Sequence, residues 1–156
     1  MLHALKELFE SLVAPANTQS PQERERTVQL ATAVMLVEVM RVDGNTDAGQ
    51  QAAITAALHE RFALPDEALT QLVDKARKVA ETANDYFRFT SSMNEQFTQA
   101  QKIGVVEAMW RVAYADAHLD PNEISLIGKI ASLLHVTQGE YIGAKMRAKE
   151  DAQLAG

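Results

Sequence analysis

Cysteine is absent from the 156 residues of this sequence. Its absence excludes thiolate zinc sites, iron–sulfur clusters and cysteine nucleophiles. A chain of this length buries roughly two-thirds of its unfolded surface when it folds, so a single domain needs no disulfide or structural metal. The lack of cysteine also fits a reducing compartment, and we expect a cytoplasmic protein.

Long apolar runs and an excess of basic residues are missing too. No apolar run approaches the roughly 20 residues of a membrane-spanning helix. Lys6, Glu7 and Glu10 interrupt the N-terminal apolar stretch, which is therefore not a signal peptide. Asp and Glu number 21 against 15 Lys and Arg, which gives a net charge of −6. An acidic domain repels the phosphates of nucleic acids, so we expect no nucleic acid partner and no direct membrane insertion.

Residues that break helices are few, with 4 prolines and 7 glycines. Apolar residues recur every three or four positions, which is the period of a helix. Capping signals such as Ser20-Pro21-Gln22-Glu23 mark where helices begin. We predict an all-α protein, a compact bundle of seven to eight helices. They are expected at about 2–14, 20–41, 48–61, 66–82, 85–96 and 98–114, with a seventh from 120 and an eighth from 137 to about 150.

The chain is expected to divide into three parts. Residues 1–20 form an N-terminal amphipathic helix and a linker, residues 21–150 form the helical domain, and residues 151–156 form a frayed tail. Within the domain, the helix at 20–41 is apolar on nearly every side from Val28 onward, and the helix at 98–114 is apolar nearly all round. This pattern predicts that both are central and buried.

An internal repeat relates the two halves of the domain. Residues 39–47 match residues 112–120, and in both copies an apolar helix ends in an Asp that a second Asp follows four residues later. The match continues into the next helix and, with one residue deleted, past its end. The paired positions there are Ile54 with Ile127, and Phe62-Ala63-Leu64 with Leu134-His135-Val136. We predict two similar helix–loop–helix halves related by a pseudo-two-fold.

The duplicated acidic loops, Asp43 to Asp47 and Asp116 to Asp120, are the strongest chemical signal in the chain. Hard cations such as Ca²⁺ and Mg²⁺ bind several carboxylate oxygens, which a loop between helices can bring together. Helix capping is the alternative, because Asp47 and Asp120 stand at N-cap positions with a polar residue three positions later. Capping does not explain Asp43 and Asp116, since an Asp that ends a helix faces the negative pole of the helix dipole. Both interpretations stay open at this point.

The order of apolar helix, Asp turn, second Asp and then Glu and Ile resembles the tellurite-resistance TerB family. So does the segment Met109-Trp110-Arg111-Val112-Ala113-Tyr114-Ala115-Asp116, and the resemblance covers about residues 25–140. It implies a compact TerB-like bundle in a stress-response system, with a divalent metal (Ca²⁺, Mg²⁺, Mn²⁺ or Zn²⁺) bound by the acidic loops. It also implies a non-enzymatic adaptor. Related domains stand beside J-domains in membrane-anchored co-chaperones, which implies stress-response partners, some of them membrane-associated.

Carried onto this sequence, the resemblance implies metal ligation by Asp43, Asp47, Asp116, Asp120 and Glu123. The sequence departs from the family pattern at two positions. Gln50 stands where the first loop is expected to have Glu, and Ala117 replaces the glycine of the second loop. A neutral amide is a poorer cation ligand than a carboxylate, so we expect the first loop to bind more weakly. The alternative function is a metal-independent, co-chaperone-like interaction domain whose acidic loops contact a basic partner.

Three further residues draw attention because their chemistry does not match their surroundings. Glu38 and Arg111 occupy equivalent positions of the repeat within apolar runs, where a lone charge is costly to bury. We therefore hypothesise an ion pair between them. Phe87 lies among neighbouring aromatic residues that one helical face cannot hide, and it is a candidate for a partner surface. No nucleophile with a neighbouring base and no glycine-rich phosphate loop is visible, so we expect no enzymatic activity.

Overall fold

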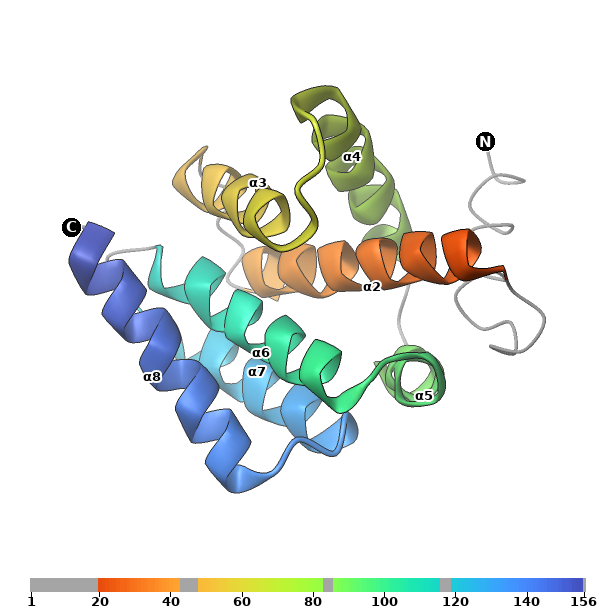
Figure 1. The fold of residues 1–156 in the computed structure, drawn as a ribbon. Coiled ribbons are helices and arrows are strands. Elements are labelled where there is room, and N and C mark those ends of the chain that lie inside the picture. The colour runs from red at the N-terminus through yellow and green to blue at the C-terminus, as the bar shows by residue number, and fades with distance from the viewer. Residues whose placement is uncertain (1–19, 43–47, 83–85, 116–118, 156) are drawn as a thin grey trace.

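The computed structural model describes residues 20–42, 48–82, 86–115 and 119–155, and these ranges contain helices and no strand. Figure 1 shows the helices packed around one another in a single bundle. The all-α prediction is confirmed, whereas the helix expected at 2–14 lies outside the described residues. The helices are α2 (Pro21–Val42), α3 (Ala48–Phe62), α4 (Asp66–Thr82), α5 (Tyr86–Gln96), α6 (Gln99–Tyr114), α7 (Pro121–Leu133) and α8 (Gln138–Ala155).

Helices α2 and α6 form the centre of the bundle. In α2 nearly every residue from Thr27 to Met40 is buried, and in α6 burial likewise extends around most of the helix. Figure 1 shows why: α3 and α4 lie against one side of this central pair, and α7 and α8 lie against the other. Helices that are apolar on all sides need neighbours on all sides. The prediction that these two helices are central is confirmed.

Local capping determines where several helices begin. At α6 the Thr98 hydroxyl accepts from the Gln101 N–H at 3.1 Å, and the Gln101 side chain accepts from the Thr98 N–H at 2.8 Å. The same reciprocal pair forms between Ser20 and Glu23 and between Thr137 and Glu140. Each pair satisfies two N–H groups that a helix end otherwise leaves without partners. The sequence contains all three signals, so these helix starts were predictable.

The repeat is confirmed in the fold. Helix α2 packs on α3 and α4 as α6 packs on α7 and α8. Two non-glycine residues have positive φ, Ala63 at 52° and His135 at 59°. They are the positions that the sequence alignment of the two halves pairs with each other. A left-handed residue after a helix redirects the chain at a fixed angle, so both halves make the same turn after their second helix.

Replacing His135 by glycine is expected to raise the free energy of unfolding by about 0.5–1 kcal/mol, since only glycine adopts positive φ without a steric cost. His135 is exposed, and the turn keeps its backbone bonds from His135 N–H to Ser132 O (3.1 Å) and from Val136 N–H to Ala131 O (3.0 Å). Urea denaturation measures the change. The control is His59→Gly inside α3, where glycine lowers helix stability. Equal destabilisation by both substitutions would contradict the argument.

Helix α8 is longer than expected. We predicted a frayed tail over residues 151–156, and the structure describes residues 151–155 as a continuation of the helix to Ala155. Two contacts hold the last turns. Ala148 is fully buried, and the Asp151 carboxylate accepts from Arg111 Nη2 at 2.5 Å. The sequence near the C-terminus contains no sign of this ion pair, because its partner is on α6.

Candidate functional site

The acidic loops are only partly within the described residues. Asp43, Asp47 and Asp116 lie outside them, and so do the side chains of Gln50 and Phe87. Within the described part of the chain, no group of three or more His, Asp or Glu side chains is placed to hold a metal ion. Asp120 and Glu123, the remaining two of the five candidate ligands, are described and lie at the start of α7.

Asp120 is the N-cap of α7, as the capping interpretation predicted. Its backbone is extended (φ −72°, ψ 132°), and its Oδ1 accepts from Asn122 N–H at 2.6 Å. Pro121 follows at the first helical position, where its fixed φ suits a helix and its missing N–H costs nothing. Capping uses one oxygen of the carboxylate, and a carboxylate has lone pairs on both. Capping and cation ligation by Asp120 are therefore compatible.

Glu123 is the third residue of α7, and it differs from the third residues of the three helices that begin with a capping box. In the three capping boxes the side chain at the third helical position lies outside the core and accepts from the N-cap N–H. Glu140, for example, accepts from Thr137 N–H at 2.9 Å. That bond, with a further one from Gln99, lowers the pKa of Glu140 below its usual range. Glu123 is 0% exposed, and no such bond joins it to Asp120. Its carboxylate is inside the protein, not part of a surface cap.

The burial of Glu123 follows from its position on α7. Leu126, Ile127 and Ile130 are buried on the same helix, three, four and seven residues later. These spacings place all four side chains on one helical face. A carboxylate on a core-facing stripe is costly unless hydrogen bonds or a positive charge compensate it. Glu123, three residues after the end of the second acidic loop, therefore places a carboxylate in the interior of the bundle.

The ion pair that we expected between Glu38 and Arg111 is wrong. Glu38 is buried, and its Oε1 lies 3.0 Å from Nη1 of Arg41, one turn later on α2. The same Nη1 donates to Ala80 O on α4 at 2.5 Å. This side of α2 thus faces α4, so Glu38 belongs to the α2–α4 contact and does not reach α6.

Arg111 points to the opposite neighbours. It bonds to the Glu60 carboxylate on α3 and, at 2.5 Å, to Asp151 on α8, and Glu107 on its own helix lies 3.8 Å away. The repeat places Glu38 and Arg111 at equivalent positions, yet their side chains meet different helices. Sequence equivalence within a repeat does not imply contact between the equivalent residues.

Replacing Glu38 by glutamine is expected to lower the free energy of unfolding by about 1.5–3 kcal/mol, the range for a hydrogen bond to a charged group. The substitution keeps the size of the side chain but removes the charge that faces Arg41. Equilibrium denaturation in urea measures the loss. Glu25→Gln on the same helix is the matched control, because Glu25 is exposed and is expected to change stability by less than about 0.5 kcal/mol. Indistinguishable effects at the two positions would refute a stabilising role for the buried carboxylate.

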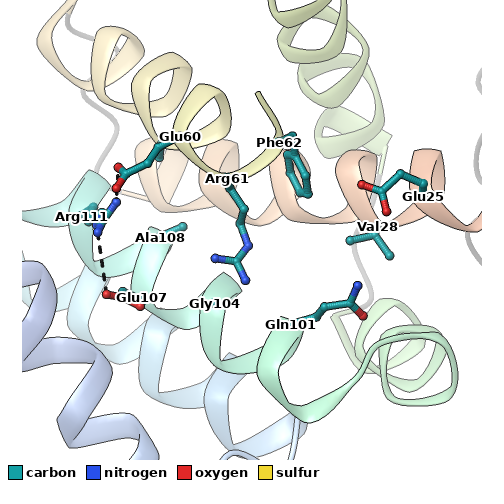
Figure 2. A pocket seen from close by; sticks show the side chains of 11 residues that line it. Glu25, Val28, Glu60, Arg61, Phe62, Gln101, Gly104, Glu107, Ala108 and Arg111 are labelled. Atoms are coloured by element: carbon teal, nitrogen blue, oxygen red, sulfur yellow. Dashed lines mark hydrogen bonds and ion pairs between the residues drawn. The ribbon is translucent and has the colours of Figure 1, made fainter. Parts of the chain in front are cut away.

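A groove of about 430 Å³ lies between α2, α3 and α6, and we call it the α3/α6 groove. Figure 2 shows Arg61 extending from α3 across this groove toward Gly104 on α6. A Cβ atom at residue 104 would lie 1.6 Å from Nη2 and 2.0 Å from Cζ of Arg61. The guanidinium therefore occupies the space that the missing side chain leaves. Neither residue was predicted from the sequence, although a glycine inside the apolar helix 98–114 was a visible signal of close approach.

The architecture is that of a small helical module built from two repeats, and in each repeat two Asp residues lie in the sequence between the first two helices. The family model described as "Tellurite resistance protein TerB" matches residues 29–146, and the chain belongs to this family. The resemblance seen in the sequence is thereby confirmed. No curated protein and no solved structure matches the chain significantly. None of the described helices is both long enough and apolar enough to cross a bilayer.

Proposed function

We propose that this TerB-family chain is a non-enzymatic module of a tellurite or stress-response system that binds a divalent cation and acts as an adaptor. The observation that carries the proposal is the full burial of Glu123, one turn into the helix that follows the second acidic loop. Helix capping accounts for Asp120 but not for a carboxylate turned into the core. Because it lies close to the second acidic loop, this carboxylate is suited to be a further oxygen ligand of a cation bound there.

The second loop is the better candidate for the site. Asp116, Asp120 and Glu123 would supply carboxylate oxygens, the donors that Ca²⁺, Mg²⁺ and Mn²⁺ prefer. Zn²⁺ is less suited, because the chain has no cysteine. Asp43 and Asp47 would form the corresponding site in the first loop, where Gln50 provides only a neutral oxygen. A bound cation would neutralise the carboxylates and link the end of α6 to the start of α7.

The adaptor role is supported by the family and by the absence of a visible catalytic arrangement in the sequence. We expect the protein to act in the cytoplasm with other stress-response proteins, some of them membrane-associated. In such a role the cation stabilises the loop that a partner contacts. The competing interpretation needs no metal: the acidic loops would contact basic residues of the partner directly.

Calorimetric titration of the full chain with Ca²⁺, Mg²⁺, Mn²⁺ and Zn²⁺ tests the proposal. At least one ion is expected to bind with measurable heat, and Asp116→Asn is expected to remove the stronger binding event while leaving the helical content unchanged. The corresponding Asp43→Asn variant in the first loop should have the smaller effect. Silence with all four ions would overturn chelation and leave the metal-independent interaction domain.

A further inference from the structure

The α3/α6 groove combines an apolar wall with a small number of polar groups. Val28 of α2, Phe62 of α3 and Ala108 of α6 provide apolar surface, while Arg61 and Gln101 provide N–H donors. The groove is open to solvent and contains none of the acidic-loop residues. Convergent donors beside an apolar wall are typical of sites that recognise a ligand with one polar and one apolar end.

Arg61 is the cationic group of this groove that is available to a ligand. Three of the other charged lining residues, Glu60, Glu107 and Arg111, form ion pairs. Glu60 bonds to Arg111, and Glu107 bonds to Arg147 at 3.2 Å. Figure 2 draws no hydrogen bond or ion pair between Arg61 and the other residues that line the groove. The guanidinium has five N–H donors in a fixed plane, and no bond to another residue that lines the groove is drawn for them.

Arg61 is exposed as a residue, but part of its guanidinium is shielded from water by α6. Its guanidinium lies on the backbone of α6 at Gly104. Desolvation lowers the pKa of Arg61 from its usual value, and the charge of Arg111 lowers it further, while the charge of Glu107 opposes both effects. A guanidinium that has lost part of its water gains more from an incoming carboxylate than a fully hydrated one does.

We propose that the α3/α6 groove docks a segment of a partner protein that presents a single carboxylate next to an apolar side chain. The carboxylate binds Arg61, with the Gln101 amide beside it, and the apolar side chain packs on Val28, Phe62 and Ala108. Charge complementarity restricts the partner to one carboxylate, because Glu25, Glu60 and Glu107 line the same groove and would repel a polyacidic tract. A C-terminal leucine or valine has this chemistry.

Two-dimensional NMR of the full chain with N-acetyl-leucine and N-acetyl-leucine amide tests the proposal. Both probes have the same apolar side chain, and only the first has a carboxylate. We expect N-acetyl-leucine to shift the backbone amides of Gln101, Gly104 and Ala108, and the amide to shift them much less. Equal shifts from the two probes, or none from either, would overturn the proposal.

Two variants separate the effect of Arg61 from general electrostatic attraction. Arg61→Gln is expected to weaken N-acetyl-leucine binding about tenfold, the effect of losing a hydrogen bond to a charged group. Arg26→Gln removes the same charge from the rim of a different groove, between α2 and α4, and is expected to leave binding unchanged. Equal weakening by both would mean nonspecific attraction and would refute the docking site.

Gly104→Ala tests whether the position of the Arg61 guanidinium against Gly104 matters for binding, while the arginine itself is kept. The new methyl group displaces the guanidinium, and alanine favours the helix, so the melting temperature is expected to stay equal or rise while binding falls. If Gly104→Ala still binds N-acetyl-leucine as the wild type does, the space left by the missing side chain at Gly104 does not position Arg61. All titrations are made in EDTA, so this proposal and the cation proposal fail independently of each other.

Discussion

Truncation of Trp110 to alanine is expected to lower the free energy of unfolding by about 3–5 kcal/mol, the range for large aromatic side chains deleted from a core. Trp110 is 0% exposed and lies in the contact between α6 and α8. Its ring stacks on Tyr114 with centroids 5.6 Å apart, meets Tyr141 at 5.8 Å, and has Lys145 Nζ 5.0 Å from its centroid. All three contacts are lost together in the variant.

Trp110→Phe is the control that separates ring packing from the indole N–H. The Nε1 atom is buried without a hydrogen bond acceptor among the described residues, so phenylalanine removes a costly unsatisfied donor along with part of the ring. We expect this substitution to cost less than half of the alanine effect. Urea denaturation followed by far-ultraviolet circular dichroism measures both, since the sole tryptophan of the chain is the residue removed. A loss below about 1 kcal/mol in Trp110→Ala would contradict the core role.

Replacement of Glu123 by glutamine is expected to abolish stabilisation by the cation. A ligand that binds only the folded state at a hundred times its dissociation constant raises the free energy of unfolding by about 2.7 kcal/mol. The wild-type chain should show this gain in thermal unfolding with the tightest-binding ion, and Glu123→Gln should show almost none. The gain of each variant is measured against its own stability in EDTA, so a change in stability without cation does not affect the comparison.

Glu140→Gln is the matched control for this experiment. Glu140 stands at the same position of its helix as Glu123, but it caps α8 at the surface. Its removal is expected to weaken the cap and leave the cation-induced gain intact. Unequal responses of the two variants to EDTA would locate the cation at the start of α7. If both variants keep the full cation-induced gain in stability, Glu123 is not a ligand. The main evidence for a cation site at the second loop is then lost.

The helices were predictable because their signals are local. A capping box such as Thr98 with Gln101 lies within four residues, and the period of the apolar positions is set by one helix alone. The repeat was visible for a related reason: Ala63 and His135 align in the sequence and share a left-handed backbone in the structure. What the chain specifies over short distances can be read from its sequence.

The ion pairs were not predictable because they depend on which helices become neighbours. Glu38 contacts Arg41 beside α4, whereas Arg111 reaches Glu60 and Asp151 on two other helices. The same long-range pairing extends α8 beyond the predicted end. The spacing of apolar residues in the sequence does not show how one helix is rotated relative to another. That rotation determines which charged side chains come into contact.

The candidate site contains one residue that local interactions place, Asp120, and one that long-range packing places, Glu123. The capping interpretation placed Asp120 at an N-cap, and it is one, because its bond to Asn122 N–H is local. Under the same interpretation Glu123 would complete a capping box, but the packing of α7 places it in the core. Its spacing from Leu126, Ile127 and Ile130 was present in the sequence and already placed it on the apolar face. The capping rule and the helical period disagreed at this residue, and the period was right.

Arg111 also determines how the two repeats are joined. The central contact between α2 and α6 is apolar, whereas Arg111 connects α3 of the first repeat with α6 and α8 of the second through exposed carboxylates. Dissolved ions screen exposed charges and leave apolar contacts largely intact. Rising ionic strength is therefore expected to weaken the ionic contacts of Arg111 between the two repeats, while the apolar contacts, including those of α3, are retained.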